Sequence, residues 1–159
     1  MSIGMKDLTA EEQAWLAKGV ITIILADDAI ERDEVDFFKR HFGVLTEEGS
    51  VISVESLVNN LKSQKFPEMW EIAIYEPEKI YFILSVLIKA IYANGKKLRE
   101  EVDQYFKVGK LMGVSLQVLT FKLNIDTNIR NLLDQDSELK ETIRTQAAGK
   151  LKRVDGADQ

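Results

Sequence analysis

Two stretches of the sequence decide the fold: residues 15–36, WLAKGVITIILADDAIERDEVD, and residues 82–103, FILSVLIKAIYANGKKLREEVD. They align without gaps at an offset of 67 residues, the separation of Asp27 and Asn94. In each stretch, an apolar segment leads through a short polar connection into Glu-Val-Asp. The apolar side chains recur at spacings of one, three and four residues, which is typical of helices. We therefore predict an all-α protein, a helical bundle built from two repeated helical hairpins.

Capping and stop signals place about seven helices along the chain. Thr9 and Glu12 have the form of a capping box at the start of the first helix. Pro77 fits the first position of the helix that carries the second stretch. Three serines are candidate N-caps of other helices: Ser53, Ser115 and Ser137. The expected helices cover residues 10–26, 33–43, 53–61, 78–93, 98–112, 115–133 and 137–149.

Composition indicates one globular domain. The chain has 159 residues, of which 45% are hydrophobic and 30% charged, and it is long enough to bury a core. We expect a single domain over residues 1–149, with hairpin repeats at about 15–44 and 82–114, and a charged, frayed tail over residues 150–159.

The longest apolar stretch, Ile80 to Tyr92, contains Lys89 and is too short to span a bilayer. With no leader pattern at the start, a cytoplasmic protein without membrane insertion is expected.

The charge and the residue inventory exclude several kinds of function. A net charge of -5 argues against non-specific nucleic-acid binding, which needs a basic surface. The absence of cysteine excludes disulfides, thiolate nucleophiles and cysteine-ligated metals. The single histidine, His41, lies near Phe37 and Phe42, where a partly buried structural role is favoured over general-base catalysis. Because the sequence also has no phosphate-binding glycine loop and no nucleophile elbow, we predict that the protein is not an enzyme.

The two hairpin connections carry the residues with the most chemical meaning. Each has an Asp or Asn just after the first helix and a Glu seven residues later, Asp27 with Glu34 and Asn94 with Glu101. The turn brings the members of each pair toward each other, and oxygen ligands suit Ca²⁺ or Mg²⁺. Two other interpretations stay open. The Asp and Asn can be turn formers while the Glu caps helix amides, or the acidic residues can form a solvated patch that binds nothing.

These turns give the sequence a resemblance to the TerB-like family of tellurite-resistance proteins, over roughly residues 15–114. In that family an apolar helix leads into Ala-Asp-Gly, and a Glu follows seven residues after the Asp. The first copy matches as Ala26-Asp27, with Asp28 where glycine is usual, and the second copy matches as Ala93-Asn94-Gly95. The resemblance implies an all-helical module with a role in tellurite and chemical-stress response.

The resemblance also implies a weak divalent-cation site, for Ca²⁺ or Mg²⁺, in the acidic turns. Carried over residue by residue, its ligands are Asp27, Glu34, Asn94 and Glu101. The sequence departs from the family pattern in the second copy, where Asn94 replaces a carboxylate. Lys96 and Lys97 add positive charge beside the same turn, which opposes a cation.

A cluster of apolar side chains around Pro67 has no clean helical periodicity. Its members are Phe66, Met69, Trp70, Ile72, Ile74 and Tyr75. One interpretation is core packing beneath a linker, and the other is an exposed patch that receives a protein partner.

The sequence thus leaves two functions open. The chain is a TerB-like module with a cation site in its acidic turns, or a non-catalytic protein-interaction scaffold in which those turns are only structural. Another protein is the expected partner, and a homodimer is left open.

Overall fold

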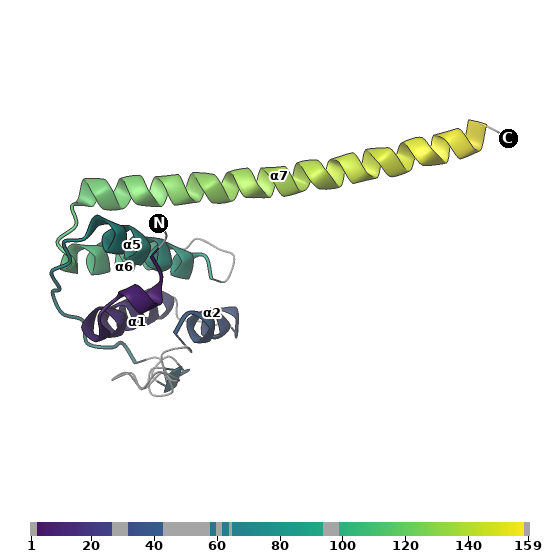
Figure 1. The fold of residues 1–159 in the computed structure, drawn as a ribbon. Helices are drawn as coiled ribbons and strands as arrows, with labels where there is room; N and C mark the ends of the chain where they lie inside the picture. The colour runs from purple at the N-terminus through teal and green to yellow at the C-terminus, as the bar shows by residue number, and fades with distance from the viewer. Residues whose placement is uncertain are drawn as a thin grey trace. The chain divides into compact units, whose positions relative to one another are not determined.

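A computed structural model of the protein describes residues 3–26, 32–42, 58–59, 62–63, 65–93 and 99–157. The regular structure of these residues is helical throughout (Figure 1), so the predicted all-α class is confirmed. Among them, no helix is both long and apolar enough to cross a membrane. The elements are a short 3-10 helix η1 (Met5–Asp7) and the helices α1 (Ala10–Ile24), α2 (Arg32–Phe42), α5 (Pro77–Ile91), α6 (Arg99–Leu111) and α7 (Leu116–Ala157).

The helix starts follow the predicted capping signals. The Thr9 hydroxyl accepts the Glu12 amide at 3.1 Å, and the Glu12 carboxylate accepts the Thr9 amide at 2.8 Å, which completes the capping box of α1. Pro77 is the first residue of α5. The Ser115 hydroxyl accepts the Val118 amide at 3.2 Å at the start of α7. These local signals therefore place the starts of three helices correctly.

The expected break at Ser137 is wrong. The structure has a single helix from Leu116 to Ala157 where two helices were predicted, and this helix includes most of the tail that was expected to fray (Figure 1). No glycine or proline occurs between residues 116 and 148, and an interior serine costs a helix only a fraction of a kcal/mol, about 0.5. Ion pairs one turn apart, Lys140 with Asp136 and Arg144 with Glu141, support the same stretch.

The described residues therefore hold five long helices, whereas about seven were predicted. One of the two missing helices is explained by α7, which joins the two helices predicted over residues 115–133 and 137–149. The expected helix over residues 53–61 lies outside the described residues except at positions 58 and 59, both of which are helical. The predicted hairpin turns, at residues 27–31 and 94–98, also lie outside them.

The chain divides into two compact units, Met1–Lys122 and Leu123–Gln159. In the first unit α1 packs against α2, α5 and α6, and α5 packs against α6. Gly19 permits a close approach here, because a β-carbon at this position would lie 3.1 Å from Val108 of α6 and 3.3 Å from Leu87 of α5. The largest fully buried side chains are Trp15, Leu16, Ile21, Ile23, Ile24, Phe38, Phe42, Ile83, Leu87, Ile88 and Tyr105.

The helix boundaries share the offset of 67 residues that was found in the sequence. The helices α1 and α5 each have 15 residues, and they begin at Ala10 and Pro77. The helices α2 and α6 both begin at an arginine, Arg32 and Arg99. Burial follows the same offset at the start of these two helices, since Glu34 and Phe38 correspond to Glu101 and Tyr105 and all four are fully buried. The repeat of whole hairpins stays a prediction.

Candidate functional site

Two of the four predicted cation ligands, Glu34 and Glu101, lie within the described residues. Each is the third residue of its helix, and each has an exposed fraction of 0%. The acidic residues just before them, Asp33 and Glu100, are exposed. Asp27 and Asn94 lie outside the described residues. The acidic stretch is therefore not uniformly solvated, because one carboxylate of each helix start lies inside the protein.

The position of Glu34 and Glu101 in the first helical turn has a direct physical consequence. The unsatisfied amides at a helix N-terminus carry partial positive charge, which stabilises a carboxylate there. Glutamate is seldom fully buried unless it has partners, and both glutamates do interact with other groups in the structure. The two carboxylates differ in hydrogen bonding, because one buried oxygen of Glu34, Oε2, but both buried oxygens of Glu101 make no hydrogen bond within the described part of the chain.

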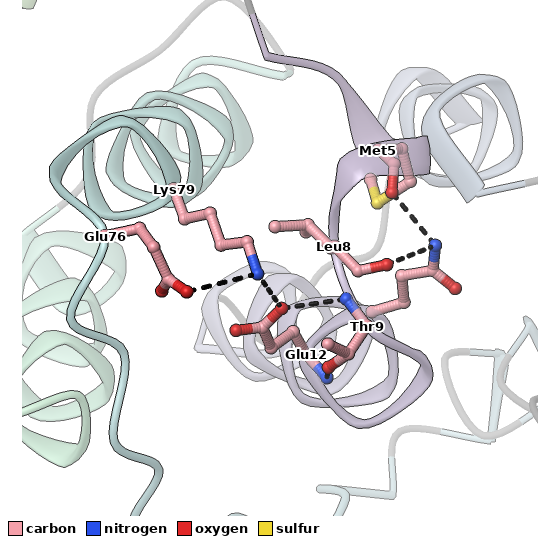
Figure 2. A network of polar contacts seen from close by, with 7 residues as sticks. Met5, Leu8, Thr9, Glu12, Glu76 and Lys79 are labelled. Atoms are coloured by element: carbon pink, nitrogen blue, oxygen red, sulfur yellow. Dashed lines mark hydrogen bonds and ion pairs between the residues drawn. The ribbon is translucent and has the colours of Figure 1, made fainter.

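Glu12 shows what a buried glutamate does at the same position in α1. It is the third residue of that helix and is nearly buried. Its carboxylate accepts the Thr9 amide at 2.8 Å and the Lys79 ammonium of α5 at 3.0 Å, as Figure 2 shows. Glu76 lies 3.8 Å from the same ammonium. A buried first-turn glutamate in this chain therefore closes a helix start and ties it to a neighbouring helix.

The electrostatics of this pair follow from its partners. Burial of Glu12 opposes ionisation, but the Thr9 amide, the hydrogen bond from Lys79 and the charge of Lys79 together outweigh it, so the pKa of Glu12 lies below its ordinary value. The hydrogen bond to Glu12 is the largest influence on Lys79, and it raises the pKa of that ammonium. Both groups are therefore charged near neutral pH, and the contact between α1 and α5 is an ion pair.

Lys79 occupies in α5 the position that glutamate occupies in α1, α2 and α6. It is the third residue of α5 and lies 67 residues after Glu12. Among the four helices, three first turns thus carry a buried or nearly buried acid, and the fourth carries the lysine that neutralises one of them. This chemistry is suited to joining helices.

The described residues contain no group of three or more acidic, histidine or cysteine side chains arranged to hold a metal ion. Glu34 and Glu101 are two of the four predicted ligands, and a hard cation such as Ca²⁺ takes six or more oxygens. The cation site predicted at Asp27, Glu34, Asn94 and Glu101 therefore stays a prediction.

The apolar cluster around Pro67 divides into anchoring and exposed members. The Trp15 indole donates a hydrogen bond to the Trp70 carbonyl at 2.8 Å, and the Lys18 ammonium lies 4.9 Å from the centre of the Trp70 ring. Phe66 and Tyr75 are 57% and 85% exposed. Trp70 is half-buried. The interpretation as core packing fits Ile74, which is 5% exposed, and that of an exposed patch fits Phe66 and Tyr75.

An extended segment, residues 71–75, forms one wall of a cleft of about 590 Å³. The Ile72 amide donates to the Leu111 carbonyl at 2.9 Å, and Ile74 is buried, so the segment is held against the end of α6. Glu71, Ala73 and Tyr75 alternate with these anchors and are exposed. The other wall is formed by residues 110–113. We call this feature the 71–75 cleft.

The sequence contains only part of the signal for this cleft. The alternation of inward and outward side chains from Glu71 to Tyr75 is that of an extended chain, and it explains why no helical period was found. The opposite wall lies about 40 positions further along the chain, at Lys110 to Gly113. Gly113 adopts a left-handed conformation with φ of 77°, which ends α6 there. No local pattern links the two walls.

His41 is partly buried, as expected. Its Nδ1 donates to the Phe37 carbonyl at 3.0 Å, since a carbonyl can only accept, and its ring centre lies 4.2 Å from that of Phe37. Burial, followed by the positive charges of Lys89 and Arg40, outweighs the hydrogen bond to Phe37 and lowers the pKa of His41.

Comparison with known proteins finds no counterpart, since no protein-family model, curated protein or solved structure matches this chain. The resemblance to the TerB-like family is thus carried by the residues of the two turns alone.

Proposed function

We propose that this chain is a non-catalytic protein-interaction module whose 71–75 cleft receives a peptide segment of another protein. The observation that carries this proposal is the extended segment itself. In a helical protein it presents three exposed residues, Glu71, Ala73 and Tyr75, beside a cleft, while Ile72 and Ile74 hold it in place. Functional residues are often found on loops held by a rigid scaffold, and extended peptides bind by pairing with exposed backbone.

The charges at the cleft define the chemistry of its partner. Glu71 and Lys110 lie on opposite walls and have opposite sign, so an extended peptide with one basic and one acidic side chain fits both walls. The exposed ring of Tyr75 adds an apolar and aromatic contact of the kind that is enriched at protein interfaces.

A peptide-display selection on the immobilised full chain tests this proposal. Selected peptides are expected to perturb amide NMR signals of residues 71–75 and 110–113, and to lose at least about tenfold in affinity for Tyr75→Ser, since interface tyrosines are frequent hot spots. Tyr81→Ser is the matched control, because Tyr81 is also exposed but does not line the cleft. Peptides that bind elsewhere, or that bind Tyr75→Ser unchanged, would contradict the proposal.

In this proposal Glu34 has the same structural role that Glu12 has in α1, whereas Glu101 shares the position and burial but not the hydrogen bonds, because neither of its carboxylate oxygens makes a hydrogen bond to a described residue. Support comes from their common place as third residue of a helix and from their burial. A glutamate there is the acceptor of a capping box.

A second candidate function follows from the same two glutamates. Their burial at matched positions favours a role in holding a divalent cation together with Asp27 and Asn94, and this is the TerB-like, stress-response alternative. A cation that binds only the folded state at about 100 times its Kd adds about 2.7 kcal/mol to the free energy of unfolding. Thermal unfolding with Ca²⁺, Mg²⁺ or Mn²⁺ therefore distinguishes the two candidates.

A further inference from the structure

The long helix α7 carries an exposed apolar stripe within the unit Leu123–Gln159. Its members lie on one side of the helix, and their exposed fractions range from 38% to 62%. They are Ile125, Ile129, Leu132, Leu133, Leu139 and Ile143. A row of half-exposed aliphatic side chains over this length is more than the scattered apolar residues of an ordinary surface.

The spacing of the stripe is that of a coiled coil. Steps of four, three, four, three and four residues lead from Ile125 to Ile143 through Ile129, Leu132, position 136 and Leu139. Such a repeat averages 3.5 residues, which keeps the stripe facing one partner helix when two helices supercoil. The six positions span 19 residues, or roughly 28 Å of helix at 1.5 Å per residue. That gives six core layers between two helices.

We propose that α7 pairs with α7 of a second copy of this chain in an antiparallel coiled coil. The stripe fits this partner because four of its five aliphatic core residues face another aliphatic residue. In the antiparallel register centred on residue 134, Ile125 of one copy faces Ile143 of the other, and Ile129 faces Leu139. This inference concerns α7 alone and does not depend on the function proposed above.

Asp136 decides the orientation. It is the one charged residue among the six core positions, and in a parallel, in-register pair it would face its own copy, which places two carboxylates together. In the antiparallel register it faces Leu132 of the other copy instead, and its carboxylate keeps the ion pair at 3.1 Å with Lys140 of its own helix. The same register brings Lys140 of one copy beside Asp126 of the other, which are opposite charges.

Sedimentation equilibrium of the full chain tests the self-association. We expect a monomer–dimer equilibrium with a dissociation constant on the order of micromolar, as suits a short interface. Leu139→Glu should raise this constant at least about 100-fold, because it buries a charge in the core. Thr145→Glu is the matched control, since it adds the same charge on the opposite side of the exposed helix, and it should leave the constant unchanged. Asp136→Leu should tighten the dimer at least about tenfold.

Single cysteines test the orientation, because the natural chain has none. Oxidation of an equimolar mixture of Ile129→Cys and Leu139→Cys should give a cross-linked heterodimer, whereas Leu139→Cys alone should not link to itself. Circular dichroism checks that every variant stays helical. A chain that stays monomeric at millimolar concentration overturns the proposal, and so does a dimer that tolerates Leu139→Glu. Self-linking of Leu139→Cys shows a parallel pair and overturns the proposed orientation.

Discussion

The buried first-turn glutamates give the sharpest prediction about stability. Replacing Glu34 by alanine removes a carboxylate that is fully buried at the start of α2. The change loses one buried methylene, worth about 0.8 kcal/mol, and the hydrogen bonds of a charged group, worth about 1.5–3 kcal/mol. We therefore expect a loss of about 2–4 kcal/mol in the free energy of unfolding. For Glu101→Ala in α6 the hydrogen-bond contribution does not apply, because neither buried oxygen of that carboxylate makes a hydrogen bond within the residues that the structure describes, so a smaller loss of about 1 kcal/mol or less is expected.

The assay is urea unfolding followed by circular dichroism, together with thermal unfolding. For a chain of this size about 1 kcal/mol shifts the melting temperature by about 2–4 °C, so Glu34→Ala should melt about 4–16 °C lower. Glu34→Gln should lose less than Glu34→Ala, because a capping box accepts glutamine in place of glutamate.

Each site has a matched control one residue earlier. Asp33→Ala and Glu100→Ala remove a carboxylate from the same first turn, but these side chains are exposed, and exposed substitutions usually change stability by less than about 0.5 kcal/mol. If Glu34→Ala is no more destabilising than Asp33→Ala, the structural role assigned to the buried carboxylate is wrong.

Three further predictions follow from the packing and charge of the first unit. Gly109→Ala should lower the free energy of unfolding in urea by about 1–2 kcal/mol, because the new β-carbon would clash with Leu119 and this cost exceeds the gain from the higher helix propensity of alanine. A more stable variant would contradict this. Thr9→Ala should cost about 1 kcal/mol through loss of the α1 cap, and an unchanged urea midpoint would count against the capping box. Folding lowers the pKa of His41 from its ordinary 6.5, so the unfolded chain binds more protons there. The free energy of unfolding should then fall as the pH drops below about 6.5. In His41→Gln it should fall less over the same pH range, because the contribution of His41 is removed.

The sequence predicts the start of a helix better than its end. The starts of α1, α5 and α7 depend on Thr9, Pro77 and Ser115, whose capping chemistry is local. The expected break at Ser137 failed because the same residue type fits a helix interior at small cost when strong helix formers surround it. A cap residue is therefore a reliable signal only where the apolar pattern also begins.

The candidate site was predictable in its residue types and less so in its environment. The spacing of the turns identified Glu34 and Glu101, but no sequence pattern showed that these two are buried while Asp33 and Glu100 are exposed. Burial depends on how α2 and α6 pack on α1, which is a property of the tertiary fold. The 71–75 cleft has the same origin, since its two walls meet only after the helices have packed.

The measurement that tests the central claim most directly is thermal unfolding of the full chain with and without saturating Ca²⁺, Mg²⁺ or Mn²⁺. If the buried glutamates only hold helices together, as Glu12 does, the melting temperature should stay within about 1 °C of its value in chelator, because a ligand that does not bind adds no stability. A rise of about 5–11 °C, the equivalent of about 2.7 kcal/mol, that is lost in Glu34→Gln would contradict the account and establish a cation site.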